Sequence, residues 1–147
     1  MTNAGGFSLL ELMVVLSLVA ILGGISVISQ QAMRPALDLS MAARQVAIDL
    51  KVARMRAVTD NANYRVAFVD GGTTYQHQRK NGDGYVDDGI PIALPRGIVI
   101  AECTATDNAI SFRPRGHAAT FGTVTIRNGK GDLRKVVVDI AGQVRVQ

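Results

Sequence analysis

The sequence GGFSLLE, residues 5–11, opens an almost unbroken apolar run that ends near Ile28. From Leu12 to Met33 no side chain carries a charge, so Glu11 is an isolated carboxylate near the front edge of this run. A charged side chain at the centre of a membrane-spanning helix costs about 2.5–3.5 kcal/mol even on insertion scales. An acid at this position therefore needs a physical reason.

The length of the apolar run fits a lipid bilayer. Residues 7–28 would form a helix of about 33 Å at roughly 1.5 Å per residue, and the hydrocarbon core of a bilayer is about 30 Å thick. A secretory signal would instead combine a basic start, a shorter apolar core and a small-residue cleavage site behind it. Residues 1–6 contain no Lys or Arg, and no A-x-A pattern follows Ile28. The sequence therefore predicts a transmembrane helix over residues 7–33 rather than an ordinary signal peptide.

The start of the chain resembles the type IV prepilin signature. That signature places Gly, Phe, Ser or Thr, two aliphatic residues and Glu at the head of a long apolar helix, as Gly6 to Glu11 do here. The resemblance implies that residues 1–6 are a leader, that a prepilin peptidase cuts between Gly6 and Phe7, and that Phe7 becomes the N-methylated terminus. It also implies a single-pass protein of the inner membrane with a periplasmic head, which later enters a pilus or pseudopilus.

Glu11 gains a role under this resemblance. Once subunits leave the membrane for a filament, a carboxylate in the apolar core needs a cation, because a buried unpaired charge is costly. The terminal amine of a neighbouring subunit can supply that cation, so Glu11 would set the register of the filament. A simple membrane anchor, with Glu11 tolerated near the interface, is the alternative, and it leaves Gly6-Phe7 and Glu11 unexplained together.

Behind the apolar run, residues 34–147 are enough for one globular head. Apolar residues recur at alternating spacings of four and three within residues 38–59, which predicts an amphipathic helix with one face on a sheet and the other in solvent. These residues are Leu39, Ala43, Val46, Leu50, Ala53 and Ala57. The helix would continue from the apolar run to about Thr59, with weak points at Gly23-Gly24 and Pro35.

Beyond Asn61 the hydrophobic period changes to two, which is typical of strands. The expected strands cover residues 64–68, 73–79, 98–103, 109–113, 120–127, 133–140 and 144–146. Asn128-Gly129 predicts a hairpin, and Ala141-Gly142 predicts a second turn. The predicted fold class is α+β, with a long N-terminal helix packed on an antiparallel β-sheet head, as in pilins.

Later motifs narrow the resemblance to the FimT/GspH family. Ala53-Arg54 with Ala57 resembles the family's A-R-x-x-A helix end, and residues 111–116 and 142–146 resemble its late strands. The family includes GspH pseudopilins of type II secretion and FimT-like minor pilins of type IV pili, and the sequence does not separate the two. The resemblance implies a structural subunit whose partners are other pilins or pseudopilins, the prepilin peptidase and the inner membrane.

The basic side chains gather near the C-terminus. Residues 110–147 carry seven basic and two acidic side chains, whereas residues 1–109 carry nine and ten, so the net charge of +4 comes from the C-terminal part. The seven are Arg113, Arg115, Arg127, Lys130, Arg134, Lys135 and Arg145. Basic patches attract nucleic-acid phosphates.

The resemblance therefore carries an alternative function, DNA capture through a Gly-Arg-x-Arg motif near the C-terminus of some FimT-like pilins. The corresponding segment, Gly142-Gln143-Val144-Arg145, keeps only the second Arg. A solvated basic face, or a docking face for acidic pilin partners, is the other interpretation.

Other chemistry has little support in the sequence. Asn81–Asp88 has the composition of a calcium loop, but Arg79 stands where the first ligand would be, so a solvated turn is the expected alternative. His77 and His117 are expected at the surface or at a sheet edge, and Cys103 as a small buried side chain. No H-E-x-x-H, C-x-x-C, G-x-S-x-G or phosphate-loop motif occurs. We therefore expect no catalytic residue, metal or cofactor; a membrane-anchored enzyme or sensor would need a site that the sequence does not display.

Overall fold

The computed structural model describes residues 8–147, with the backbone alone described over residues 23–33. The chain forms two compact units, which divide between Arg34 and Pro35. Helix α1, Leu9–Thr59, contributes to both units. Pro35 lies inside α1, although its ring removes the amide hydrogen that would bond to the preceding turn. The expected helix is thus confirmed from Leu9 onward, and neither predicted weak point ends it.

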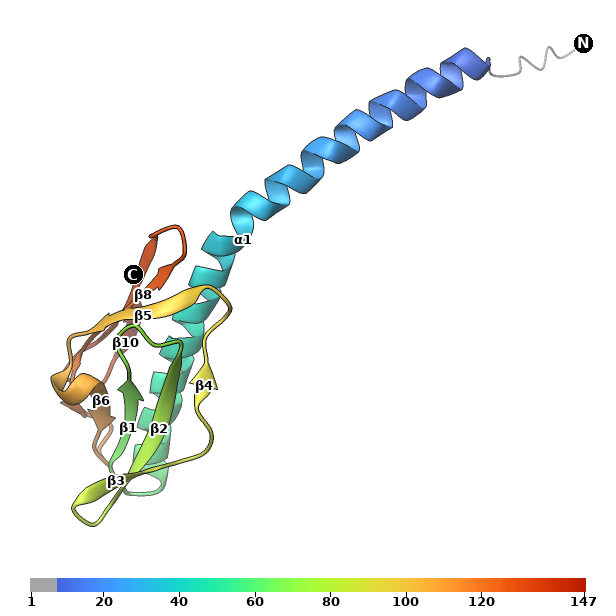
Figure 1. Ribbon diagram of the computed structural model, residues 1–147. Helices are drawn as coiled ribbons and strands as arrows, with labels where there is room; N and C mark the ends of the chain where they lie inside the picture. The colour runs from blue at the N-terminus through green and yellow to red at the C-terminus, as the bar shows by residue number, and fades with distance from the viewer. Residues whose placement is uncertain (1–7) are drawn as a thin grey trace, which may run out of the picture. The chain divides into compact units, whose positions relative to one another are not determined.

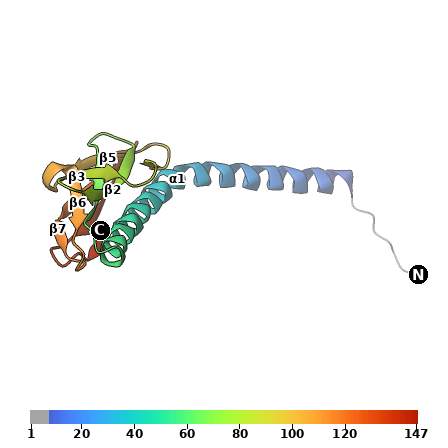
Figure 2. The same cartoon turned by 90° about the horizontal axis from the view of Figure 1, so that it is seen from below.

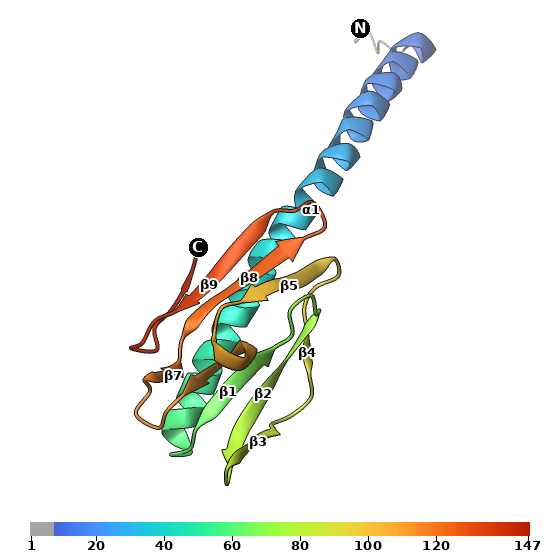
Figure 3. The ribbon, with the colours of Figure 1, turned by 60° about the vertical axis from the view of Figure 1, so that its left-hand side comes forward.

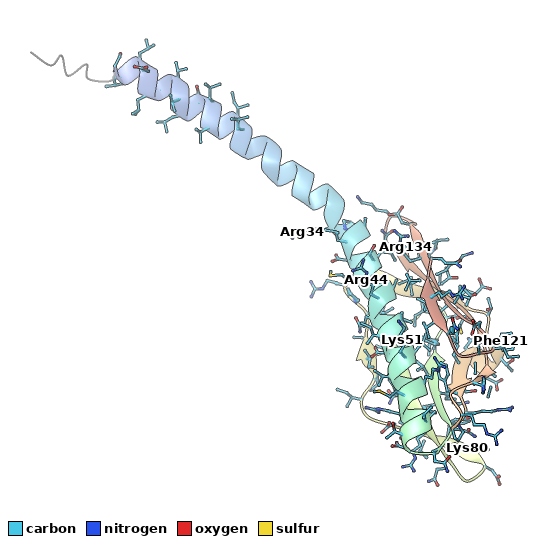
Figure 4. The ribbon with its side chains drawn as sticks, turned by 180° about the vertical axis from the view of Figure 1, so that it is seen from behind. Arg34, Arg44, Lys51, Lys80, Phe121 and Arg134 are labelled. Carbon is cyan, nitrogen blue, oxygen red and sulfur yellow. The ribbon has the colours of Figure 1, made fainter. Side chains whose placement is uncertain are left out.

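The apolar part of α1 defines the first unit. Every large apolar side chain within residues 9–22 is between 50% and 77% exposed. Figure 4 shows these side chains projecting from all sides of the helix. A helix that is apolar all round is normally buried among other apolar groups. Within the described part of its own unit, no other element covers this segment.

The rest of α1, residues 35–59, belongs to the second unit together with all the strands (Figure 1). One face of this helix segment is buried. It carries the six predicted residues, joined by two further alanines: Leu39, Ala42, Ala43, Val46, Ala47, Leu50, Ala53 and Ala57. Complete burial of a side chain such as that of Leu50 contributes about 1.5–3 kcal/mol, so this face holds the segment firmly on the strands.

The strands form two antiparallel sheets. The first has the order β3-β2-β1-β6-β7, with β4 paired to β2. Its members are β1 (Tyr64–Phe68), β2 (Thr74–Asn81), β3 (Gly84–Asp87), β4 (Ile92–Ala93), β6 (Ala109–Phe112) and β7 (Ala118–Thr120). The second has the order β10-β9-β8-β5. Its members are β5 (Ile98–Cys103), β8 (Gly122–Asn128), β9 (Leu133–Val138) and β10 (Val144–Val146), and a short 3-10 turn, η1 (Thr106–Asn108), links β5 to β6.

Both sheets pack on the same side of residues 35–59, as Figures 2 and 3 show. The period-two pattern explains why. Tyr64, Val66 and Phe68 are the buried residues of β1, and Val124 and Ile126 are among the buried residues of β8. These side chains join the buried face of the helix in a single hydrophobic cluster, so the core lies between the helix and the two sheets.

Some sheet details differ from the expectation of one sheet. Strands β3 and β4 were not predicted, because Gly84–Asp87 is rich in residues that disfavour strands and Ile92–Ala93 is too short to show a period. The expected strand over residues 120–127 is divided, since β7 ends at Thr120 and β8 begins at Gly122.

The hairpin predicted at Asn128-Gly129 is present between β8 and β9, but its loop is wider than a two-residue turn. Arg127 pairs with Leu133, so the loop spans residues 128–132. The Asn128 carboxamide oxygen accepts hydrogen bonds from the backbone N–H groups of Lys130 and Asp132, at 3.0 and 2.9 Å. An Asn side chain that folds back on its own loop stabilises such turns.

Candidate functional site

The N-terminal candidate site is described only from Ser8 onward. Gly6 and Phe7, the expected cleavage and methylation positions, lie outside the described residues. Glu11 lies in the first turn of α1 and is exposed, and no hydrogen bond or ion pair joins its side chain to another residue of the described chain. Its carboxylate is therefore available to a partner from outside. No helix in the described part of the chain has a stretch both long enough and apolar enough to cross a membrane.

The seven basic residues of the C-terminal part do not form one surface. Arg113 and Arg115 lie at the β6–β7 turn of the first sheet, whereas the other five lie in the second sheet and its hairpin loop. Along β9, Arg134 alternates in step with the buried Val136, so it lies on the helix-facing side of the sheet, while Lys135 lies on the opposite side. The structure thus divides the predicted basic cluster among four places: the β6–β7 turn, the two sides of the second sheet and its hairpin loop.

Three of these cations do share a surface, the outward side of the second sheet. Lys135 lies opposite Thr125, two residues along β8 from Arg127, and Arg145 lies opposite Val137, two residues along β9 from Lys135. All three cations are exposed. This arrangement is a small solvated basic face rather than a long phosphate-binding groove.

An open groove of about 890 Å³ lies beside the β6–β7 turn. Arg113, Arg115 and His117 line it together with the exposed apolar side chains of Phe121 and Ile140. Phe121 is labelled in Figure 4. Among the described residues, no group of three or more His, Cys, Asp or Glu side chains is placed to hold a metal ion, in this groove or elsewhere.

Arg54 lies where three segments come together whose sequences resemble FimT/GspH motifs, namely residues 53–57, 111–116 and 142–146. Its Nε donates to the carbonyl oxygen of Gly116 at 2.8 Å, and its Nη2 donates to that of Ala141 at 3.4 Å. Gly142 lies in the same junction, with a φ of +76°. A Cβ atom at Gly142 would lie 2.4 Å from the Gly116 oxygen, so only glycine fits there. The motif residues therefore occur together because they fasten the end of the helix to two turns, one from each sheet.

A second set of polar contacts joins the helix to β2. The Tyr75 hydroxyl donates to the Asp49 carboxylate, and burial, followed by this bond, raises the pKa of Tyr75 far above its ordinary value. His77 is buried, contrary to the expected surface position, because it is an inward residue of β2. Burial lowers the pKa of His77, and its Nδ1 has no hydrogen-bond partner among the described residues.

The segment Asn81–Asp88 is a hairpin turn followed by a strand. Asn81 pairs with Gly84 across the turn. Asp87 accepts a hydrogen bond from Gln78 at 2.8 Å, and Asp88 forms an ion pair with Arg56 at 2.5 Å. Its last two carboxylates therefore already have partners within the head.

The remaining candidates behave as isolated side chains. His117 is exposed, in agreement with the expected surface position. Cys103 is buried as predicted, and burial raises the pKa of its thiol, which disfavours the reactive thiolate.

Residues 42–142 match the family described as type II transport protein GspH. The chain belongs to the GspH family. Residues 1–27 match the prokaryotic N-terminal methylation motif. The resemblance stated from the sequence is thereby confirmed for both ends of this GspH chain.

Two solved structures share the fold of this GspH chain. The minor pseudopilin EpsH of the type II secretion system of Vibrio cholerae has a TM-score of 0.61 at 11% identity, covering 75% of this chain and 96% of that one. The type IV minor pilin FimU of Pseudomonas aeruginosa has a TM-score of 0.61 at 15% identity, covering 76% and 90%. This likeness confirms the predicted α+β pilin fold. No curated protein sequence matches the chain.

The GspH match and the methylation motif together make this chain a minor pseudopilin or minor pilin of type II secretion or type IV pili. Proteins of this kind are structural subunits rather than enzymes. DNA capture, the alternative drawn from the basic C-terminal residues, is not favoured by these comparisons.

Proposed function

We propose that this chain is made as an inner-membrane precursor and is built into a type II secretion pseudopilus or a type IV pilus. Prepilin peptidase removes residues 1–6, and Phe7 becomes the N-methylated terminus. The apolar part of α1 holds the chain in the membrane, with the head in the periplasm, until assembly begins. The observation that carries the proposal is the match of residues 1–27 to the methylation motif on a chain of the GspH family.

The exposed apolar side chains of residues 9–22 support this proposal. Eleven large apolar side chains exposed by half or more would be unfavourable in water, because each loses the free energy of burial. Lipid and then the helices of neighbouring pilins would supply the missing cover. The sequence adds to this support, since residues 12–33 contain no charged side chain.

Glu11 is proposed to set the register of each subunit in the filament. An unpaired carboxylate among apolar helices would cost several kcal/mol, and pairing with the terminal amine of a neighbour offsets this cost. The exposed Glu11 of the described helix, without an intramolecular partner, is consistent with this role. The alternative reading of Glu11, an acid tolerated at the membrane interface, requires no such partner.

The experiment is incorporation of Glu11→Ala into filaments in cells that carry the matching assembly system. We expect normal membrane insertion and a large loss of incorporation, measured by immunoblotting of sheared filaments against the membrane fraction. Ser17→Ala is the matched control on the same segment, because among the described residues the Ser17 hydroxyl bonds to the nearby Val14 carbonyl oxygen alone. Incorporation of Glu11→Ala at the wild-type level would contradict the register proposal.

A further inference from the structure

The outward face of the second part of α1 carries a regular row of exposed side chains. Its apolar members are Leu37, Met41, Ile48, Met55 and Val58, each between 53% and 61% exposed. Arg44 and Lys51 complete the row, and both are exposed. The sequence predicted a solvated face here, and the exposure of five large apolar side chains on it is a departure from that prediction.

The spacing of this row is that of a helix-packing seam. Residues 37, 41, 44, 48, 51, 55 and 58 follow one another at alternating intervals of four and three, which is the heptad pattern of helices that pack side by side. The seam runs over about 32 Å at roughly 1.5 Å per residue. It lies opposite the face that packs on the sheets, although Val58 at its end lies close to Gly116 of the β6–β7 turn.

The side chains of the two cations of the seam have no partner in the described chain, whereas those of Asp49, Arg54 and Arg56 do. Arg54 donates to the Gly116 and Ala141 carbonyls, Arg56 pairs with Asp88, and Asp49 accepts from Tyr75. Among the described residues, no hydrogen bond or ion pair involves the side chain of Arg44 or Lys51. Figure 4 shows both on the side of the helix seen from behind, with Arg134 beside Arg44.

These cations act against pairing of the seam with a second copy of itself. In a parallel pair Arg44 would face Arg44, and in an antiparallel pair centred on Ile48 it would face Lys51. Like charges brought together in a partly desolvated seam destabilise both arrangements. Carboxylates on the partner, seven residues apart, would instead pair with both cations.

We propose that residues 37–58 form a docking seam for a helix of a different pilin-type subunit, whose facing row carries two carboxylates seven residues apart. This inference rests on the proposed function, because it assigns the chemistry of the partner within such an assembly. Arg44 and Lys51 act as specificity-determining residues, since they favour a heterologous neighbour over another copy of the chain. The apolar residues of the seam supply contact area, and the charges supply the choice of partner.

The test is photo-crosslinking of the full-length chain in cells that carry its own assembly system, with a benzoylphenylalanine at Ile48. We expect an adduct with a helix of another pilin-type chain, whose crosslinked peptide is sequenced and contains the two carboxylates. The double variant Arg44→Glu/Lys51→Glu should lower the yield about tenfold, since two attractive pairs become repulsive. Exchange of the partner's two carboxylates for Lys should restore it.

A matched control reverses two exposed cations elsewhere in the head, Arg79→Glu/Lys80→Glu on β2, and should leave the yield unchanged. Four results would overturn the proposed docking seam: an adduct with a second copy, an adduct with lipid, a yield insensitive to charge reversal, or no adduct at all. The yield is measured in extracted membranes as well as in filaments, so the seam is tested whether or not assembly occurs. N-terminal processing and the Glu11→Ala assay, measured in the same cells, report separately on the proposed function.

Discussion

Two segments of one helix have opposite surroundings. Residues 9–22 expose every large apolar side chain, whereas residues 39–57 bury a full face against two sheets. Both segments are rich in apolar residues, and both lie in α1. The difference lies in whether the chain itself provides the partner.

Coverage of its apolar face distinguishes an element that stabilises the fold from one that serves assembly. A segment whose apolar face is covered within the chain contributes to the stability of the head, and a segment left uncovered contributes to contacts made outside it. Substitutions in the second segment or its attachments, compared with substitutions elsewhere, test this separation.

The largest effect is expected from Leu50→Ala. Leu50 is fully buried between the helix and the sheets, so its truncation should lower the free energy of unfolding by about 2–5 kcal/mol. Leu16→Ala, in the exposed segment, should change it by less than about 0.5 kcal/mol. Urea unfolding of the full-length chain in detergent, followed by the near-ultraviolet circular dichroism of the tyrosines, measures both. Equal destabilisation by the two variants would contradict the separation.

The next effect concerns the junction that fastens the helix end to both sheets. Gly142→Ala and Gly131→Ala both place a side chain at positive φ, which costs about 1–2 kcal/mol. At Gly142 the new Cβ would also meet the Gly116 oxygen at 2.4 Å, whereas nothing lies within 4 Å at Gly131. We therefore expect Gly142→Ala to lower the free energy of unfolding by about 1–3 kcal/mol more than Gly131→Ala does. Similar unfolding curves for the two variants would show that the junction is loose.

A smaller effect is expected at the bond between Tyr75 and Asp49. Tyr75→Phe should lower the free energy of unfolding by about 1–2 kcal/mol at neutral pH, since the Asp49 carboxylate loses its donor. The pKa of Tyr75 is raised in the folded state, so its contribution is fully present below the ordinary value of 10.0 and is lost as the pH rises above it. The variant should therefore lose less stability than the wild type between pH 10 and 12. Tyr85→Phe is the control on β3.

The smallest effect is a pH dependence carried by His77. Burial lowers the pKa of this imidazole in the folded state, so the unfolded chain binds the proton more readily. Stability contributed by neutral His77 is present above the ordinary value of 6.5 and falls as the pH drops below it. His77→Gln should flatten the stability profile between pH 7 and 5. A profile unchanged by His77→Gln would place the titrating group elsewhere.

Periodicity was sufficient to predict the main elements of the fold. The helix to Thr59 and the strands β1, β5 and β10 agree with their predicted bounds, because an uninterrupted period marks each of them. The split of the strands into two sheets could not be predicted, since it depends on which strand edges meet after folding. Strand β3 was not predicted because Gly84 and Asp87 disfavour strands. Its formation depends on pairing with β2.

The candidate sites were only partly predictable for a related reason. The motif residues around Arg54 were recognisable as a pattern, but their convergence on the Gly116 and Ala141 carbonyls is a long-range contact. The seven basic residues all lie in the C-terminal part of the sequence, residues 110–147. The turns and the alternation along the strands nevertheless distribute them over different surfaces. The buried row of the helix was predicted correctly, but the outward seam was missed, because Arg44 and Lys51 indicated a solvated face and the exposure of the five large apolar side chains beside them depends on the folded structure.

The most direct test of the account is mass analysis of the N-terminus of the native protein extracted from membranes. We expect a chain that begins at N-methylated Phe7 and keeps the apolar segment of α1. A native protein that retains residues 1–6, or one that has lost the apolar segment, would contradict the assignment of this chain to a filament.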